Sequence, residues 1–205
     1  MNLSITLIII ILTALVSITS FGRPDQIDKL SFWPYMIQER KQWYRFLTGG
    51  FVHNDYMHLI FNMLTLYFFG RAMEQIYFAV FGSNLYFLLL YVLGLVLPGV
   101  STYFRQKDNY GYRAVGASGA VSAVLFSIVV FEPWYTIYPF GIIPIPAVIF
   151  AVLYLGYSWY MSKRGMDNIG HDVHFWGAVL GLIFPIVLKP ELFKLFVAKL
   201  MQPHF

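Results

Sequence analysis

Long apolar runs without a charged side chain are the feature that most limits how this chain can fold. No residue between Met1 and Gly22 is charged, and the same is true from Gln75 to Phe104. A helix needs about 20 apolar residues to cross a bilayer. Charged residues make up only 12% of the 205 residues and hydrophobic ones 59%. This number of charged side chains is too small to cover the surface of a soluble protein. The composition therefore predicts an integral membrane protein without a separate soluble domain.

The apolar material is sufficient for about six spans. They are expected at residues 3–21, 55–72, 84–104, 115–131, 145–161 and 169–188. The first run lacks a basic start and a small-residue cleavage site, which favours an uncleaved helix over a signal peptide. A first loop covers residues 23–54, and the tail, 189–205, is expected to be amphipathic or interfacial. The predicted fold is an all-α membrane protein, a single six-helix domain over residues 1–205.

The absence of cysteine and the scatter of basic residues exclude several classes of function. Without cysteine there is no disulfide framework, thiolate nucleophile or cysteine-ligated metal. The fourteen Lys and Arg residues lie between apolar runs and form no basic stripe, so they indicate loop charges beside a bilayer and no nucleic-acid partner. His171 and His174 form an H-x-x-H without the glutamate of a zinc protease, and we interpret His171 as a loop or rim residue. No metal or cofactor is expected.

Charge alone leaves the orientation open. With six spans both termini share a side, and that side has four of the basic residues against ten on the other. The positive-inside rule would place the termini outside. Five of the ten lie in the long first loop, which weakens the signal. The four are Arg71, Lys189, Lys194 and Lys199.

Four polar residues are expected at one depth in the membrane. His58 and Asn62 lie near the start of the second span, Ser118 near the start of the fourth and His174 near the start of the sixth. Even-numbered helices enter from the same face, so each residue lies roughly one to two turns below that surface. Intramembrane polar groups are costly, which makes this layer a candidate functional site.

Rows of small residues predict which helices touch. The fourth span opens with GASGA at residues 116–120, and the sixth has Gly177 and Gly181 on the same face as His174. Such rows let backbones approach closely in lipid. Each row alone is typical of a packing motif, and a single membrane histidine is more often structural than catalytic. Together they bring a hydroxyl and an imidazole to facing helices, which is the arrangement that a serine nucleophile and its base require.

The residues from Gln42 to Gly181 resemble the rhomboid family of intramembrane serine proteases. The resemblance rests on several motifs in the family's order: Trp43-Tyr44-Arg45 in the first loop, H-x4-H-x3-N at His53, His58 and Asn62, G-x3-E at Gly70 to Glu74, G-x-S-G at Gly116 to Gly119, and H-x2-G at His174 to Gly177.

The resemblance implies a Ser118/His174 dyad with no acidic third member. The oxyanion would be held by the Ser118 amide, His58 and Asn62. Structural or packing roles are implied for Gly116, Gly119, Gly177, Gly181, Arg45 and Glu74. Two positions depart from the family: Ser122 stands where an aromatic residue often stacks on the catalytic imidazole, and Val173 stands where alanine is frequent.

Partners and location also follow from the resemblance. Substrates would be transmembrane helices of other proteins, and membrane lipid would surround the chain. Bacterial relatives imply a multi-pass protein of the cytoplasmic membrane with both termini in the cytoplasm. One alternative is a non-catalytic rhomboid-like protein that binds client transmembrane helices. Another is a transporter or channel, but none of the ten Asp and Glu residues lies deep in an expected span. The sequence indicates no oligomeric state.

Overall fold

The structure, a computed structural model, describes residues 4–164 and 170–203. The expected first residues of spans one and six, 3 and 169, lie outside the described residues. The elements in chain order are α1 Ile5–Ser20, α2 Pro24–Leu30, α3 Pro34–Arg40, α4 Arg45–Thr48, η1 Gly49–Phe51, α5 Tyr56–Thr65, η2 Leu66–Gly70, α6 Arg71–Phe81, α7 Leu85–Val96, α8 Pro98–Gln106, α9 Ser118–Phe131, β1 Thr136–Ile137, η3 Pro139–Gly141, β2 Ile145–Pro146, α10 Ala147–Arg164, α11 His171–Leu188 and α12 Glu191–Leu200.

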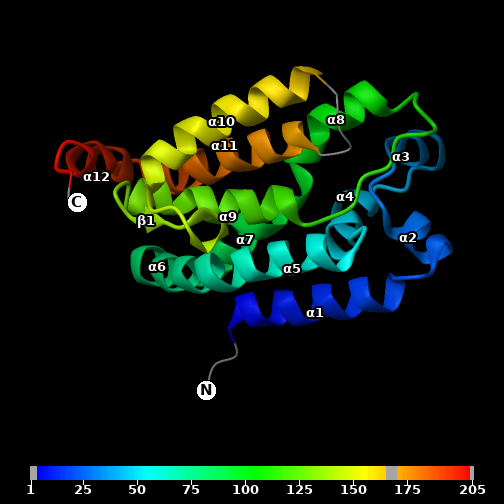
Figure 1. The fold of residues 1–205 in the computed structure, drawn as a ribbon, viewed down its shortest axis with the longest axis horizontal. Helices are drawn as coiled ribbons and strands as arrows, with labels where there is room; N and C mark the ends of the chain where they lie inside the picture. Colours follow the sequence, from blue (N-terminus) through cyan, green and yellow to red (C-terminus); the bar gives the residue numbers. More distant parts are fainter. Residues whose placement is uncertain (1–3, 165–169, 204–205) are drawn as a thin grey trace.

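The long helices form a bundle whose two ends differ. The short helices α2, α3 and α4 of the first loop lie together with the outer part of α8 at one end, on the right in Figure 1. The helices α5, α9 and α11 all begin at this end. The β1–β2 hairpin and α12 lie at the opposite end. The candidate residues at the starts of α5, α9 and α11 therefore share one end of the bundle.

The helical class is as predicted, apart from the two-residue strands β1 and β2. Among the described residues, two helices are long and apolar enough by length and composition to cross a membrane: Leu85–Gln106, which joins α7 and α8, and α11. The apolar helices α1 and α9 are shorter, with 16 and 14 residues.

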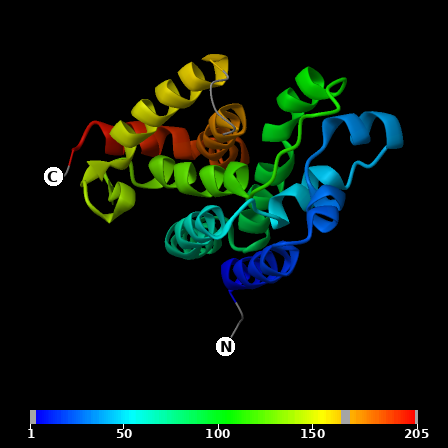
Figure 2. The same cartoon turned by 45° about the vertical axis from the view of Figure 1, so that its right-hand side comes forward.

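Helix α9 is the centre of the bundle. Every residue of α9 except Ser118 and Leu125 is buried. A helix that is apolar and buried on all sides is a core helix rather than a surface helix. Its neighbours include α11, α7, α10 and α5, and Figure 2 shows it between α5 on one side and α10 with α11 on the other. Ser118 is thus the partly open first residue of an otherwise enclosed helix.

Glycines let α9 and α11 touch through their backbones. A methyl group added at Gly177 would overlap the carbonyl oxygen of Gly119, and one added at Gly181 would overlap that of Ala123. On the other side of α9, a methyl group at Gly94 of α7 would lie 2.6 Å from the Ala120 Cα atom. Packing at this distance stabilises helix pairs in lipid, where the hydrophobic effect contributes little.

The second long helix extends further than the expected span, which ends at residue 72. Helix α5, the π-helical turn η2 and α6 follow one another without a break from Tyr56 to Phe81. Gly70 and Arg71 do not end the helix because both keep right-handed helical angles. Gly82 ends it, with a φ of +76° in the left-handed region that favours glycine at a helix C-terminus.

Glu74 ties this long helix to the start of α1. Its carboxylate accepts hydrogen bonds from the backbone N–H groups of Ile5, at 2.8 Å, and Thr6, at 3.1 Å. The Ser4 and Thr6 hydroxyls donate to the same group at 2.6 and 2.8 Å. The first N–H groups of a helix have no partner within it, so a residue of α6 caps α1.

The far end of the bundle is closed by α12. The Lys199 ammonium donates to the Phe131 carbonyl at 2.8 Å, at the end of α9, and pairs with Glu132 at 2.6 Å. Helix α12 lies in the tail for which an amphipathic or interfacial piece is expected, and it exposes Phe193 and Leu195 while burying Leu192. Helix α10 begins at Ala147, two residues after the expected start of the fifth span.

Candidate active site

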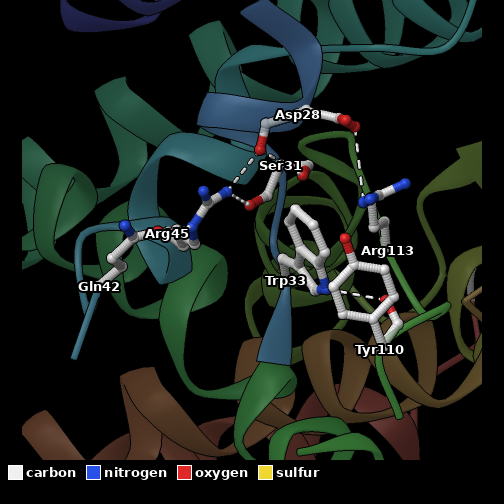
Figure 3. Close-up of polar contacts among 7 residues, drawn as sticks. All are labelled: Asp28, Ser31, Trp33, Gln42, Arg45, Tyr110 and Arg113. Atoms are coloured by element: carbon white, nitrogen blue, oxygen red, sulfur yellow. Dashed lines mark hydrogen bonds and ion pairs between the residues drawn. The ribbon is translucent and has the colours of Figure 1, made fainter. Parts of the chain in front are cut away.

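The first loop is organised around Arg45. Its side chain is 3% exposed and donates hydrogen bonds to the Asp28 carbonyl at 2.6 Å, the Ser31 carbonyl at 2.9 Å and the Gln42 side chain at 2.6 Å (Figure 3). Asp28 and Ser31 belong to the last turn and C-cap of α2, where carbonyls lack helical partners and a cation is favourable. Burial lowers the pKa of Arg45, and nearby Tyr44 and Asp28 oppose this effect.

The loop is also clamped to the segment that leads into α9. The Arg113 guanidinium lies 3.8 Å from the centre of the Trp33 ring and pairs with Asp28 at 3.5 Å. The Trp33 indole donates to the Tyr110 carbonyl at 3.0 Å, and both residues lie beside Arg113 in Figure 3. These contacts fix the first loop against residues 110–113.

Three of the residues between Arg113 and Ser118 are hydrogen-bonded to the first loop through their backbone. Ala114 exchanges two hydrogen bonds with Phe32, at 2.9 and 3.0 Å. The Gly116 N–H donates to the Gly49 carbonyl at 2.9 Å, and the Ala117 N–H donates to His53 Nε2 at 3.4 Å. The first loop thus holds three of the four residues that precede Ser118.

His53 is the inner support of this segment, a role that the sequence analysis did not assign. Its ring is fully buried, and its Nδ1 atom lies 2.9 Å from the Ser17 hydroxyl. Ser17 gives its only proton to the Phe51 carbonyl at 2.9 Å. His53 Nδ1 must therefore carry a hydrogen, which leaves Nε2 free to accept from Ala117. Burial, aided by His58, lowers the pKa of His53 to about 3 and keeps this neutral tautomer.

Gly116 is required by both its backbone and its neighbour. Its φ is +115°, an angle that L side chains rarely adopt, and a methyl group there would lie 2.6 Å from His58 Cε1 and 2.8 Å from Nε2. The His58 ring therefore rests directly on the backbone two residues before Ser118. On its other side it meets the His53 ring edge-on, with centroids 4.9 Å apart.

His58 and Asn62 lie one above the other on α5. Asp55 caps this helix by accepting from the His58 N–H at 2.8 Å. Asn62 is 6% exposed, and its amide donates to the His58 carbonyl at 2.9 Å. The structure thus brings His58 to the backbone that leads into Ser118, with Asn62 one turn deeper.

Ser118 and His174 lie on the two helices that touch through Gly119 and Gly177. Ser118 is the first residue of α9, and His174 lies one turn before Gly177 on α11. The Val173 side chain reaches the backbone of Gly119, since a methyl group added at Gly119 would lie 2.9 Å from Val173 Cγ1. Within the described residues, no hydrogen bond joins the Ser118 hydroxyl to His174. Such bonds are often long in free enzymes and tighten when substrate binds.

The His174 ring has two aromatic neighbours. Tyr154 of α10 lies nearly parallel to it, with an interplanar angle of 23° and centroids 6.5 Å apart. The ring of His171 meets it edge-on at 6.2 Å. His171 is 5% exposed and packs against Tyr157, which places it inside the bundle and not on a loop or rim. That part of the sequence interpretation is wrong, because His171 is already the first residue of α11.

The start of α11 is fastened to α8 by Asp172. Its carboxylate accepts a hydrogen bond from Thr102 and forms an ion pair with Arg105. An acidic residue in the first turn is favourable for a helix, and here it also ties the residues beside His174 to a second element. Among the described residues, no three His, Asp or Glu side chains come together as a metal site would require.

Comparison with known proteins decides the family. The family model for the rhomboid domain matches residues 40–191. The chain belongs to the rhomboid family. This confirms the resemblance drawn from the motifs, and this rhomboid is therefore an integral membrane protein, in agreement with its apolar helices.

The related proteins include named proteases. Over 89% of its length, this rhomboid is 26% identical to the rhomboid protease GlpG of Haemophilus influenzae, of which it covers 90%. It is 28% identical over 67% of its length to the mitochondrial RHOMBOID-like protein 12 of Arabidopsis thaliana. It is 30% identical over 44% of its length to the putative rhomboid protease YdcA of Bacillus subtilis. It spans 44% of the Arabidopsis relative and 41% of the Bacillus one.

Proposed function

We propose that this rhomboid is an intramembrane serine endopeptidase with Ser118 as nucleophile and His174 as its base. The observation that carries the proposal is the backbone contact between Gly119 and Gly177, because it brings the helices bearing these two side chains as close as two helices can pack. The protease names of several relatives support the same class of reaction.

The reaction follows from the chemistry of the two groups. The Ser118 oxygen attacks the scissile carbonyl carbon while His174 accepts the hydroxyl proton. The tetrahedral intermediate collapses when the C–N bond breaks, and His174 delivers the proton to the leaving amine. Water then attacks the acyl-enzyme by the same route in reverse and frees Ser118.

Three donors are suited to hold the oxyanion. The Ser118 N–H opens α9, and N–H groups at a helix start have no partner within the helix. His58, resting on the Gly116 backbone, and Asn62, one turn deeper on α5, supply side-chain donors. A donor fixed in a site of low dielectric contributes about 3 kcal/mol to the transition state.

Substrates in this proposal are transmembrane helices of other proteins, cut near the end of the bundle at which α5, α9 and α11 begin. The six spans are α1, α5 to α6, α7 to α8, α9, α10 and α11. The membrane is the bacterial cytoplasmic membrane, with both termini in the cytoplasm. Protease digestion of spheroplasts, whose periplasmic membrane face is accessible, tests the orientation: a tag after Phe205 must stay protected.

The decisive experiment is cleavage of a model transmembrane substrate by the purified protein, with product masses read out. Ser118→Ala and His174→Ala must each abolish cleavage while expression stays normal. Ser127→Ala, further along α9 where the hydroxyl contacts Tyr77, is the control for removal of a hydroxyl, and Ser118-dependent labelling by a fluorophosphonate probe is a second readout.

Unchanged cleavage by Ser118→Ala would overturn the proposal. A folded wild-type protein that neither cleaves nor reacts with the probe would instead favour the non-catalytic protein that binds client helices.

A further inference from the structure

Tyr154 is the largest side chain in the narrow contact stripe of α10. The buried residues of this helix are Ala147, Ala151 and Ser158, and Tyr154 completes the stripe at spacings of four, three and four. Residues at these spacings share one helix face. The opposite face is open, with Val152 68% exposed. Helix α10, which lies along α11 in Figure 1, therefore meets the bundle through one face, to which Phe150 and Leu155 also contribute.

The Tyr154 ring connects the two helices of the proposed dyad. Its hydroxyl lies 3.3 Å from the Ser122 hydroxyl, one turn below Ser118 on α9. Its ring is nearly parallel to the His174 ring of α11, at the distance and angle given above. Aromatic rings at such separations attract each other in offset stacked geometry.

Two further rings hold Tyr154 in place from behind. The Phe126 ring lies 4.9 Å from it and the Phe150 ring 5.6 Å, centroid to centroid. Phe126 and Phe150 are themselves stacked at 5.8 Å. A ring that is fixed by neighbours and by a hydrogen bond gives a rigid wall beside the His174 ring.

We propose that Tyr154 positions His174, so that the alignment of the catalytic base depends on how α10 docks against α9 and α11. This inference rests on the proposed function. Tyr154 is a positioning residue: it acts on the imidazole and not on the substrate. If α10 moves away from the bundle, the wall moves with it and the base loses its orientation.

Separate variants distinguish the ring from its hydroxyl and from its bulk. Tyr154→Phe keeps the ring and loses the contact with Ser122, so kcat should fall by less than about threefold. Tyr154→Leu keeps apolar bulk but lacks a flat face. We expect kcat and the rate of fluorophosphonate labelling to fall about 10- to 100-fold, with KM within about twofold, because misplacing a catalytic group costs on this scale.

Relocating the ring is the sharper test. Ser122 faces the Tyr154 hydroxyl, so Ser122→Tyr combined with Tyr154→Ala places a ring in the vacated space, now carried by α9. We expect labelling to recover at least about tenfold relative to Tyr154→Ala alone. Tyr160→Ala is the matched control, since Tyr160 lies on the same helix and is 47% exposed.

The outcomes separate this inference from the proposed function. If wild type reacts with the probe at Ser118 but Tyr154→Leu reacts equally fast, the positioning role is refuted and the protease proposal stands. Equal losses in Tyr154→Phe and Tyr154→Leu, or no recovery in a relocated variant that melts normally, also refute it. If wild type shows no labelling that Ser118→Ala removes, both proposals are wrong.

Discussion

Replacing Gly116 by alanine tests whether the backbone before Ser118 sets the place of His58. The new methyl group would lie 2.6 Å from His58 Cε1, whereas carbon atoms pack comfortably at about 3.5 Å. The ring must therefore withdraw by about 0.9 Å. A hydrogen bond of about 2.9 Å that lengthens by this amount is lost. Since one oxyanion donor is worth about 10²- to 10³-fold in kcat, Gly116→Ala should cost about 10²-fold.

A double-mutant cycle tests whether Gly116→Ala lowers activity through His58. His58→Ala removes the proposed oxyanion donor itself, so adding Gly116→Ala to it should cost little more activity. The strained φ of +115° will lower stability by about 1 to 3 kcal/mol in both backgrounds, which thermal unfolding in detergent measures separately. Gly111→Ala is the control, because Gly111 is exposed and a methyl group there would meet only Asn109 Oδ1, at 3.5 Å.

The assay is cleavage of a model transmembrane substrate at saturating concentration, with Ser118-dependent probe labelling beside it. Losses that multiply in the double variant would show that Gly116 acts by a route other than His58. Full activity of a folded Gly116→Ala protein would remove His58 from the oxyanion site altogether.

Three further predictions concern the supports of the site. Glu74→Gln should destabilise the protein by about 1 to 3 kcal/mol, because the amide keeps only one of the two accepting oxygens and turns its NH2 group toward the donors at the start of α1; an unchanged melting temperature would contradict this. The pKa of His53, about 3 in the folded protein against 6.5 for an unperturbed histidine, means that the unfolded chain binds a proton that the folded protein does not. Stability is then fully present above pH 6.5 and falls toward pH 3 by up to about 1.4 kcal/mol per pH unit; His53→Gln should lose this part of the slope, and parallel curves would refute it. Arg45→Lys should lower both melting temperature and probe labelling, since one ammonium cannot replace a planar guanidinium on three acceptors; the exposed Arg40→Lys is its control, and equal behaviour of the two would exclude the role.

The contact between α9 and α11 could be predicted because it depends on the spacing of small residues within each helix. Gly177 and Gly181 share a helix face with His174, and the small residues after Ser118 offer the matching surface. Helical periodicity fixes a face without knowledge of the rest of the fold. The common end of α5, α9 and α11 follows from counting spans. Both features follow from the order of the segments and the rise of a helix alone.

Other features depend on contacts between distant parts of the chain. The H-x4-H-x3-N motif contains His53, but its hydrogen bond to Ala117 spans 64 residues and has no local signature. Nothing in the sequence indicates that Tyr154 lies beside His174, since an aromatic residue in an apolar helix is ordinary. The end of the second long helix differs from the prediction because Gly70 keeps helical angles and serves close packing, since a methyl group there would lie 2.9 Å from Thr6 Cγ2 of α1. The true end at Gly82 requires a left-handed angle that sequence indicates only weakly.

The cap that Glu74 places on α1 has a consequence for biogenesis. The hydrogen bonds join residues separated by 68 to 70 positions, so the first helix leaves the ribosome long before its acceptor exists. Until then, its leading N–H groups must be solvated by water or lipid headgroups, because the bilayer interior offers them no partner. In the proposed six-span arrangement, the start of α1 gains its hydrogen-bond acceptor only once α6 has followed it, so α1 and the second long helix reach their final packing together.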